Sequence, residues 1–264
     1  APLGNTAPDA PAADADKAKD LLGDMTVVAS AARALPRIGV VPSISADLED
    51  VTLRSVVRRD LDLCGEVEVL AESAAPDGLY LSDSEVDTKA WGKKGAEAVI
   101  RVIGRKTGDA PGDKIELIGQ AFFVKSGPTP VFEKKLTALP AELRTASHRI
   151  ADALIGALSG QNGGFASRMT FASGAGKLRR VYMIDADGNG ARAVSSENEI
   201  ALAPAFGKNE ELYYASSSDN AQYRIRSEGG KDYPLPVKGS VYGVAFSRDR
   251  SKVAVSIGVG GSVQ

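Results

Sequence analysis

Two segments in the first part of the chain repeat apolar side chains every three to four positions, the spacing of one face of an α-helix. The first runs from Ala46 to Cys64 and the second from Pro140 to Ser159. Their apolar faces consist of Leu53, Val56, Val57, Leu61 and Cys64, and of Leu143, Ile150, Leu154 and Leu158. Gly65 and Gly160 follow the two segments, and glycine tolerates the left-handed backbone that ends many helices. We therefore predict two amphipathic helices.

Shorter β-branched or alternating runs surround these helices and are typical of strands. They cover Val27–Val28, Arg37–Val41, Val67–Val69, Ala98–Arg105, Lys114–Lys125 and Pro130–Leu136. The turn Gly108–Asp113 predicts a hairpin between the two long runs, and Asp87–Gly95 predicts one or two helical turns. Strands and helices in this order indicate a small α/β domain whose mixed sheet is covered by helices.

A different sequence pattern occurs twice in the last third of the chain. Tyr182–Asn189 is echoed by Tyr223–Gly230, and Ala205–Glu210 by Ala245–Arg250. Both echoes come about 40 residues later, a period typical of propeller blades. Alternating runs and turn residues in each unit predict one four-stranded sheet per repeat. A propeller closes with about four to eight sheets, so we expect an incomplete propeller of about two blades, truncated inside its fold.

These patterns divide the chain into three parts. Residues 1–20 are rich in Ala, Pro and Asp, the composition of a disordered arm. Residues 21–162 are predicted to form the α/β domain, and residues 163–264 the incomplete all-β propeller. The chain begins with Ala1 and has no apolar targeting segment, so we expect a removed signal peptide or a trimmed terminus.

Charge and composition argue against several classes of partner. The 32 basic and 34 acidic residues give a formal net charge of −2, which gives no reason to expect nucleic acid or an anionic membrane as a partner. No run approaches the roughly 18 apolar residues of a membrane-spanning helix. The chain has one cysteine and one histidine, too few for a zinc site built from the usual ligands.

His148 is the first candidate for chemistry. Asp152 lies one helical turn away and Ser147 is adjacent, but adjacent residues on a helix do not face each other. We expect His148 to lie on a helix surface or at a domain interface. On this assignment Leu154→Ala costs about 2 to 5 kcal/mol of stability, whereas His148→Ala costs about 1 kcal/mol or less.

Two other motifs lack a required group. Gly174–Lys177 does not have the spacing of a phosphate-binding loop. Asp185–Asn189 begins like a calcium loop, but Ser196 stands where a bidentate Glu is required, so we predict a hairpin turn. Cys64 has no positive neighbour in sequence to favour a thiolate, and we expect it to be a buried small hydrophobe. The sequence therefore predicts no catalytic, cofactor-binding or metal-binding residues.

An ordered set of segments resembles one known family. The segments are Arg37–Pro42, Trp91 with Gly95–Ile100, Leu143–Asp152, Leu158–Gly160 with Gly164–Met169, and Asp185–Gly188 with Ala203–Phe206. Together they resemble the TolB family of the bacterial Tol-Pal envelope complex. The blade turns of that family usually read Ser-Pro-Asp-Gly, whereas this chain has Gly207–Glu210 and Ser247–Arg250. It is therefore similar to a divergent member with fewer than the family's six or so blades.

The resemblance implies a periplasmic scaffold and no enzyme. Members of this family bind the peptidoglycan-associated lipoprotein through the propeller and the inner-membrane protein TolA through an N-terminal segment. The resemblance also implies roles in outer-membrane integrity, in envelope constriction at cell division and in colicin import. Loops around Asn189 and Asp219 are candidates for partner contacts, because loops carry variation on a rigid scaffold.

An enzymatic alternative is the propeller part of a prolyl-oligopeptidase-like hydrolase. Its blades would look similar, since propellers share the same turns and strands. Such an enzyme needs a G-x-S-x-G nucleophile elbow, and none occurs in these 264 residues.

Overall fold

The computed structural model describes residues 34–218, 221–236, 238–260 and 262–263. The fold below is that of the compact unit Pro36–Gln264. The predicted arm over residues 1–20 and the run Val27–Val28 lie outside the described residues.

A five-stranded mixed sheet forms the base of the α/β domain, with strand order β2-β1-β3-β4-β5. The strands are β1 (Arg37–Val40), β2 (Glu68–Val69), β3 (Ala98–Lys106), β4 (Ile115–Phe123) and β5 (Phe132–Ala138). Strand β1 pairs in parallel with both β2 and β3, whereas β3, β4 and β5 are antiparallel neighbours. The predicted mixed sheet and its long hairpin are therefore confirmed.

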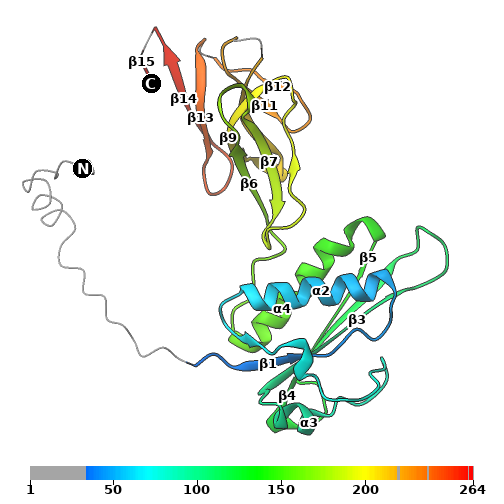
Figure 1. Cartoon of the computed structure of the whole chain (residues 1–264). Coiled ribbons are helices and arrows are strands. Elements are labelled where there is room, and N and C mark those ends of the chain that lie inside the picture. Colours follow the sequence, from blue (N-terminus) through cyan, green and yellow to red (C-terminus); the bar gives the residue numbers. More distant parts are fainter. Residues whose placement is uncertain (1–33, 219–220, 237, 261, 264) are drawn as a thin grey trace, which may run out of the picture. The chain divides into compact units, whose positions relative to one another are not determined.

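Two helices, α2 (Leu48–Leu63) and α4 (Leu143–Ser159), lie side by side across one face of this sheet (Figure 1). Their predicted apolar stripes meet the sheet in one core, in which Leu53, Leu61, Ile150 and Leu154 are fully buried. Backbone φ angles of 71° at Gly65 and 86° at Gly160 end the two helices as expected. Cys64 is only half-buried at the end of α2, where we expected full burial.

A short helix, α3 (Thr88–Lys93), covers the opposite face of the sheet. Asp87 caps it by accepting a hydrogen bond from the Ala90 backbone N–H at 2.9 Å. Trp91 lies directly over Gly39 of β1, where an added Cβ would approach the indole ring to 2.3 Å. Glycine at this position is what allows the tryptophan to pack on the sheet.

Three antiparallel sheets follow α4, and their strand orders are β6-β7-β8, β12-β11-β10-β9 and β13-β14-β15. Their strands are β6 (Arg168–Ser173), β7 (Arg180–Asp185), β8 (Arg192–Ala193), β9 (Ile200–Phe206), β10 (Leu212–Ser217), β11 (Arg224–Ser227), β12 (Asp232–Tyr233), β13 (Ser240–Phe246), β14 (Val253–Val259) and β15 (Ser262–Val263). Successive small antiparallel sheets are the architecture of an incomplete propeller. An α/β domain followed by propeller-type sheets is the fold predicted from the sequence.

The sequence repeat is offset from these sheets. The repeat that opens at Tyr182 places its first two strands, β7 and β8, in one sheet and its last two, β9 and β10, in the next. The expectation that one repeat makes one sheet is therefore wrong. After α4, the described residues form one sheet of four strands and two of three.

Five 3₁₀ turns complete the described secondary structure. They cover Glu72–Ala74, Val124–Ser126, Pro140–Glu142, Gly176–Leu178 and Lys208–Glu210. None of the helices in the described ranges is long and apolar enough to cross a lipid bilayer.

Candidate functional site

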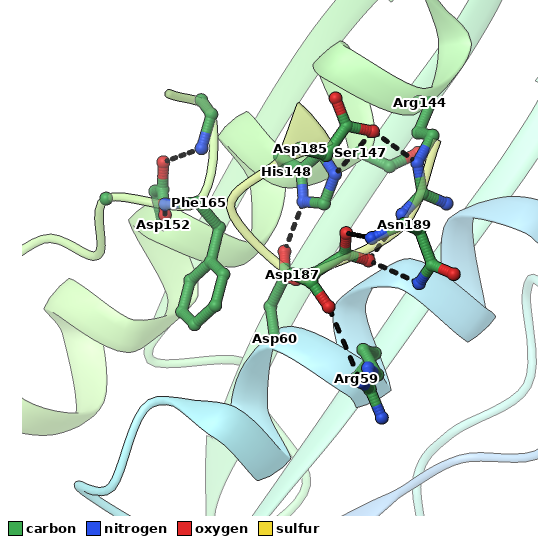
Figure 2. A network of polar contacts seen from close by, with 12 residues as sticks. Arg59, Asp60, Arg144, Ser147, His148, Asp152, Phe165, Asp185, Asp187 and Asn189 are labelled. Atoms are coloured by element: carbon green, nitrogen blue, oxygen red, sulfur yellow. Dashed lines mark hydrogen bonds and ion pairs between the residues drawn. The ribbon is translucent and has the colours of Figure 1, made fainter. Parts of the chain in front are cut away.

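Helices α2 and α4 each place one ionisable residue inside an otherwise apolar interface. Asp60 lies three and four positions after Val57 and Val56 on the buried stripe of α2, and it is completely buried. His148 of α4 is 2% exposed. Because the two helices pack together, the His148 Nδ1 and Asp60 Oδ2 atoms lie 2.7 Å apart (Figure 2). Buried ionisable groups are paired in this way because an isolated buried charge is costly.

The hairpin turn between β7 and β8 reaches the same place. Arg144 of α4 donates from Nε to Asp185 Oδ2 at 2.6 Å and from Nη2 to an Asp187 carboxylate oxygen. Arg59 of α2 donates to the Asp187 backbone carbonyl at 3.4 Å. The first propeller sheet is thus attached to both helices of the α/β domain by a fork of charge-assisted hydrogen bonds.

Asp187 is also held by its own turn. The Asn189 backbone N–H donates to Asp187 Oδ1 at 2.9 Å, and its side-chain amide donates to Oδ2 at 3.0 Å. Burial alone would raise the pKa of Asp187, but the hydrogen bonds from Asn189 and Arg144 outweigh it and lower the pKa to about 2. This carboxylate therefore stays ionised.

Burial and the contact between His148 and Asp60 have opposing effects on the pKa of each group. Burial favours neutral imidazole, but the hydrogen bond to Asp60 and its negative charge prevail, so the pKa of His148 is raised. Burial also raises the pKa of Asp60, and His148 offsets only part of that rise. Two buried atoms, Asp60 Oδ1 and His148 Nε2, have no hydrogen-bond partner among the described residues. Nε2 faces Asp185 Oδ2 across 3.8 Å.

The residues considered for catalysis are separated in the structure. Ser147 Oγ donates to the Leu143 carbonyl at 2.8 Å, within its own helix. Asp152 accepts hydrogen bonds from the backbone N–H groups of Phe165 at 2.7 Å and Ala166 at 2.9 Å. It ties the segment after α4 back onto that helix. His148 pairs with Asp60 instead, and this pair has no nucleophile at Nε2 among the described residues.

The same cluster has some features of a metal site. Asp60, His148 and Asp187 each offer one ligand atom, and these atoms lie within 4.8 Å of one another. However, the Arg144 guanidinium already holds an Asp187 oxygen and would repel a second cation. The arrangement is that of an ion-pair network.

The sequence does not connect Asp60, Arg144, Asp185 or Asp187 with His148, although the hairpin turn predicted at Asp185–Asn189 is confirmed. One signal was present: Asp60 interrupts the apolar stripe of α2, and a charge on a buried stripe requires a partner. Of the two positions expected for His148, the structure shows the domain interface and not the helix surface, because the side chain lies buried between α2, α4 and the β7–β8 turn. A small cost for its removal therefore no longer follows.

The loop at Asn189, expected to contact partners, faces α2 and α4 within this chain. The loop at Asp219 lies outside the described residues.

Acid is expected to weaken the attachment of the turn. The folded-state pKa of Asp187, about 2, is below the ordinary value of about 3.9. Its contribution to stability is therefore present above about pH 4 and lost as the pH falls toward 2. Unfolding free energies measured from pH 5 to pH 2 should decline less steeply for Asp187→Asn than for the unchanged chain. Asp62→Asn, which alters an exposed aspartate of α2, is the control, and a decline equally shallow for both variants would contradict the assignment.

Comparison with known proteins identifies the family of the α/β domain. Residues 25–116 match the family model described as the TolB amino-terminal domain. The chain carries a TolB amino-terminal domain. The Tol-Pal system protein TolB of Methylococcus capsulatus is 31% identical over 177 residues, which cover 66% of this chain and 40% of the relative. Its counterpart in Syntrophotalea carbinolica is 26% identical over 197 residues, or 71% of this chain and 42% of the relative.

A solved structure extends the similarity beyond the TolB amino-terminal domain. TolB from Acinetobacter baumannii superposes on this chain with a TM-score of 0.66 and a sequence identity of 20%. The matched region makes up 87% of this chain and 56% of that protein. The fold of this chain, domain and propeller-type sheets together, is therefore that of the corresponding part of TolB. The resemblance drawn from the ordered segments is confirmed. The chain spans about two fifths of the length of these two curated relatives.

Proposed function

We propose that this chain acts as a periplasmic, non-enzymatic scaffold of the Tol-Pal system. The observation that carries the proposal is that one chain contains both a TolB amino-terminal domain and propeller-type sheets, in the same order as in TolB. Curated relatives over the same residues are named for the Tol-Pal system. In this proposal the propeller binds the peptidoglycan-associated lipoprotein, and an N-terminal segment binds a TolA-like inner-membrane protein. The resulting complex supports outer-membrane integrity and constriction at division, and colicins use it for import.

The geometry of the buried cluster favours a scaffold over a hydrolase. A Ser-His-Asp hydrolase needs a serine hydroxyl at the second imidazole nitrogen and an open site for substrate. In this chain His148 Nε2 faces Asp185, and His148 is buried between α2, α4 and the β7–β8 turn. Its paired side chains hold parts of the chain together.

A binding experiment tests the scaffold. The polypeptide, extended to the length of its curated relatives, should retain the periplasmic domain of the peptidoglycan-associated lipoprotein from the same bacterium at micromolar concentration. It should hydrolyse no ester or peptide substrate. An unrelated periplasmic protein on the same resin is the control, and failure to retain the lipoprotein would remove the central support of the proposal.

A further inference from the structure

The only histidine of the chain lies between carboxylates from two parts of the fold. Its Nδ1 atom is 2.7 Å from Asp60 Oδ2 on α2, and its Nε2 atom is 3.8 Å from Asp185 Oδ2 at the end of β7 (Figure 2). Asp60 is fixed in the α/β core, whereas Asp185 belongs to the first propeller sheet. The imidazole therefore sits where the propeller turn meets the helices.

Every element packed around His148 contributes charge. Helix α2 brings Asp60 and Arg59, which donates to the carbonyl of Asp187. The β7–β8 turn brings Asp185 and Asp187, both held by Arg144 of α4. Asp152, one turn further along α4, adds negative potential at Asp60.

The protonation state of His148 decides whether its contacts with Asp60 and Asp185 are favourable. A protonated imidazole carries an N–H donor on both nitrogens. Its positive charge then lies between Asp60, which is hydrogen-bonded, and Asp185, which is at ion-pair distance. A neutral imidazole that still donates to Asp60 turns a lone pair toward the Asp185 carboxylate. In that state Nε2 accepts no hydrogen bond from the described residues, and its lone pair faces another hydrogen-bond acceptor.

We propose that His148 is a proton-operated latch: its protonated ring bridges Asp60 and Asp185 and holds the β7–β8 turn on helices α2 and α4, and loss of the proton loosens that contact. Arg144 and Arg59 retain some attachment in either state, because their charge does not change over this range. The latch therefore modulates docking of the first propeller sheet and leaves the two folds intact.

The direction of the pH effect follows from linkage. Docking brings the Asp185 carboxylate to 3.8 Å from Nε2 and adds the negative charge of Asp187, so the docked state binds the proton more tightly than the undocked state. The pKa of His148 is raised in the folded chain, and its contribution is fully present below the ordinary histidine value of about 6.5. That contribution is lost as the pH rises through the raised pKa. Strong acid also opens the latch by protonating the carboxylates.

A nuclear magnetic resonance titration reads the latch directly, since one histidine gives one set of ring signals. The chain, purified without a histidine tag, should titrate above the ordinary value. Asp185→Asn should weaken proton binding by about tenfold, the usual effect of one close opposite charge. Asp249→Asn is the matched control: Asp249 also occupies a propeller turn, and its side chain bonds to Ser247 and Ser251 within that turn. Equal titration curves for Asp185→Asn and the unchanged chain would overturn the proposal.

Hydrogen exchange provides a readout of docking itself. After correction for intrinsic rates, protection of residues 185–189 should fall between pH 6 and pH 8.5, while the turn at residues 247–251 in the same molecule should not change. His148→Gln should remove this pH dependence. Protection of residues 185–189 that does not depend on pH in the unchanged chain would overturn the proposal. Protection at pH 8.5 that requires added zinc chloride and is lost with a chelator would also overturn the proposal. In that case a metal ion, and not the protonated imidazole, would be the bridging cation.

Discussion

Replacing His148 with alanine is expected to lower the free energy of unfolding by about 3 to 5 kcal/mol, the usual cost of removing one partner from a buried ion pair. The side chains of His148 and Asp60 are 3% and 0% exposed, and their nearest atoms lie 2.7 Å apart. Without the imidazole, the Asp60 carboxylate keeps no partner in its buried position and must protonate or admit water. Denaturant titration at pH 6, followed by the fluorescence of the single buried Trp91, measures the loss.

Leu154→Ala gives the scale for this result, because Leu154 is a fully buried residue of the same helix. Its loss is expected to cost about 2 to 5 kcal/mol through the cavity that remains. A double variant, His148→Ala with Asp60→Asn, should recover part of the His148 cost, since the unpaired charge is then gone. A cost of about 1 kcal/mol or less for His148→Ala would mean that the contact with Asp60 does not form.

The elements of the α/β domain are predictable because each depends on local spacing. The stripe through Leu53 and Leu61 and the stop at Gly65 fix α2 without reference to the rest of the chain. Similarly, the turn Gly108–Asp113 joins two runs that can pair only as a hairpin. In such segments the sequence pattern and the tertiary environment require the same residues.

Contacts between elements are not predictable in this way. Nothing local to Asp185 or Asp187 indicates that their turn meets Arg144, which lies some 40 residues earlier in the chain. The same limit explains why the prediction of one sheet per repeat is wrong. The repeat is visible in the sequence, but backbone hydrogen bonding decides which strands share a sheet. Strand β9 pairs with β10 at the edge of a new sheet, although β8 precedes it in the same repeat.

A second buried charge joins three strands of the four-stranded sheet. Glu199, 4% exposed and adjacent to β9, accepts hydrogen bonds from the Tyr214 hydroxyl at 3.1 Å and from Ser216, both on β10. It also pairs with Arg226 of β11 at 2.9 Å. Burial and the charge of Glu199 raise the pKa of Tyr214, so the phenol remains a hydrogen-bond donor at physiological pH.

Glu199→Ala is therefore expected to cost about 3 to 5 kcal/mol, because the buried hydroxyl groups of Tyr214 and Ser216 and the Ser196 N–H lose their shared acceptor. Arg226 keeps its ion pair with Asp232. Glu210→Ala is the matched control: this glutamate also pairs with an arginine, Arg168, but at 3.4 Å with side chains 68% and 40% exposed. An exposed pair of this kind contributes about 1 kcal/mol or less. Unfolding followed by circular dichroism should rank the two variants in that order. Equal costs would show that Glu199 does not hold these strands together, and the sheet would then depend on its apolar residues, such as Leu212 and Ile225, for its stability.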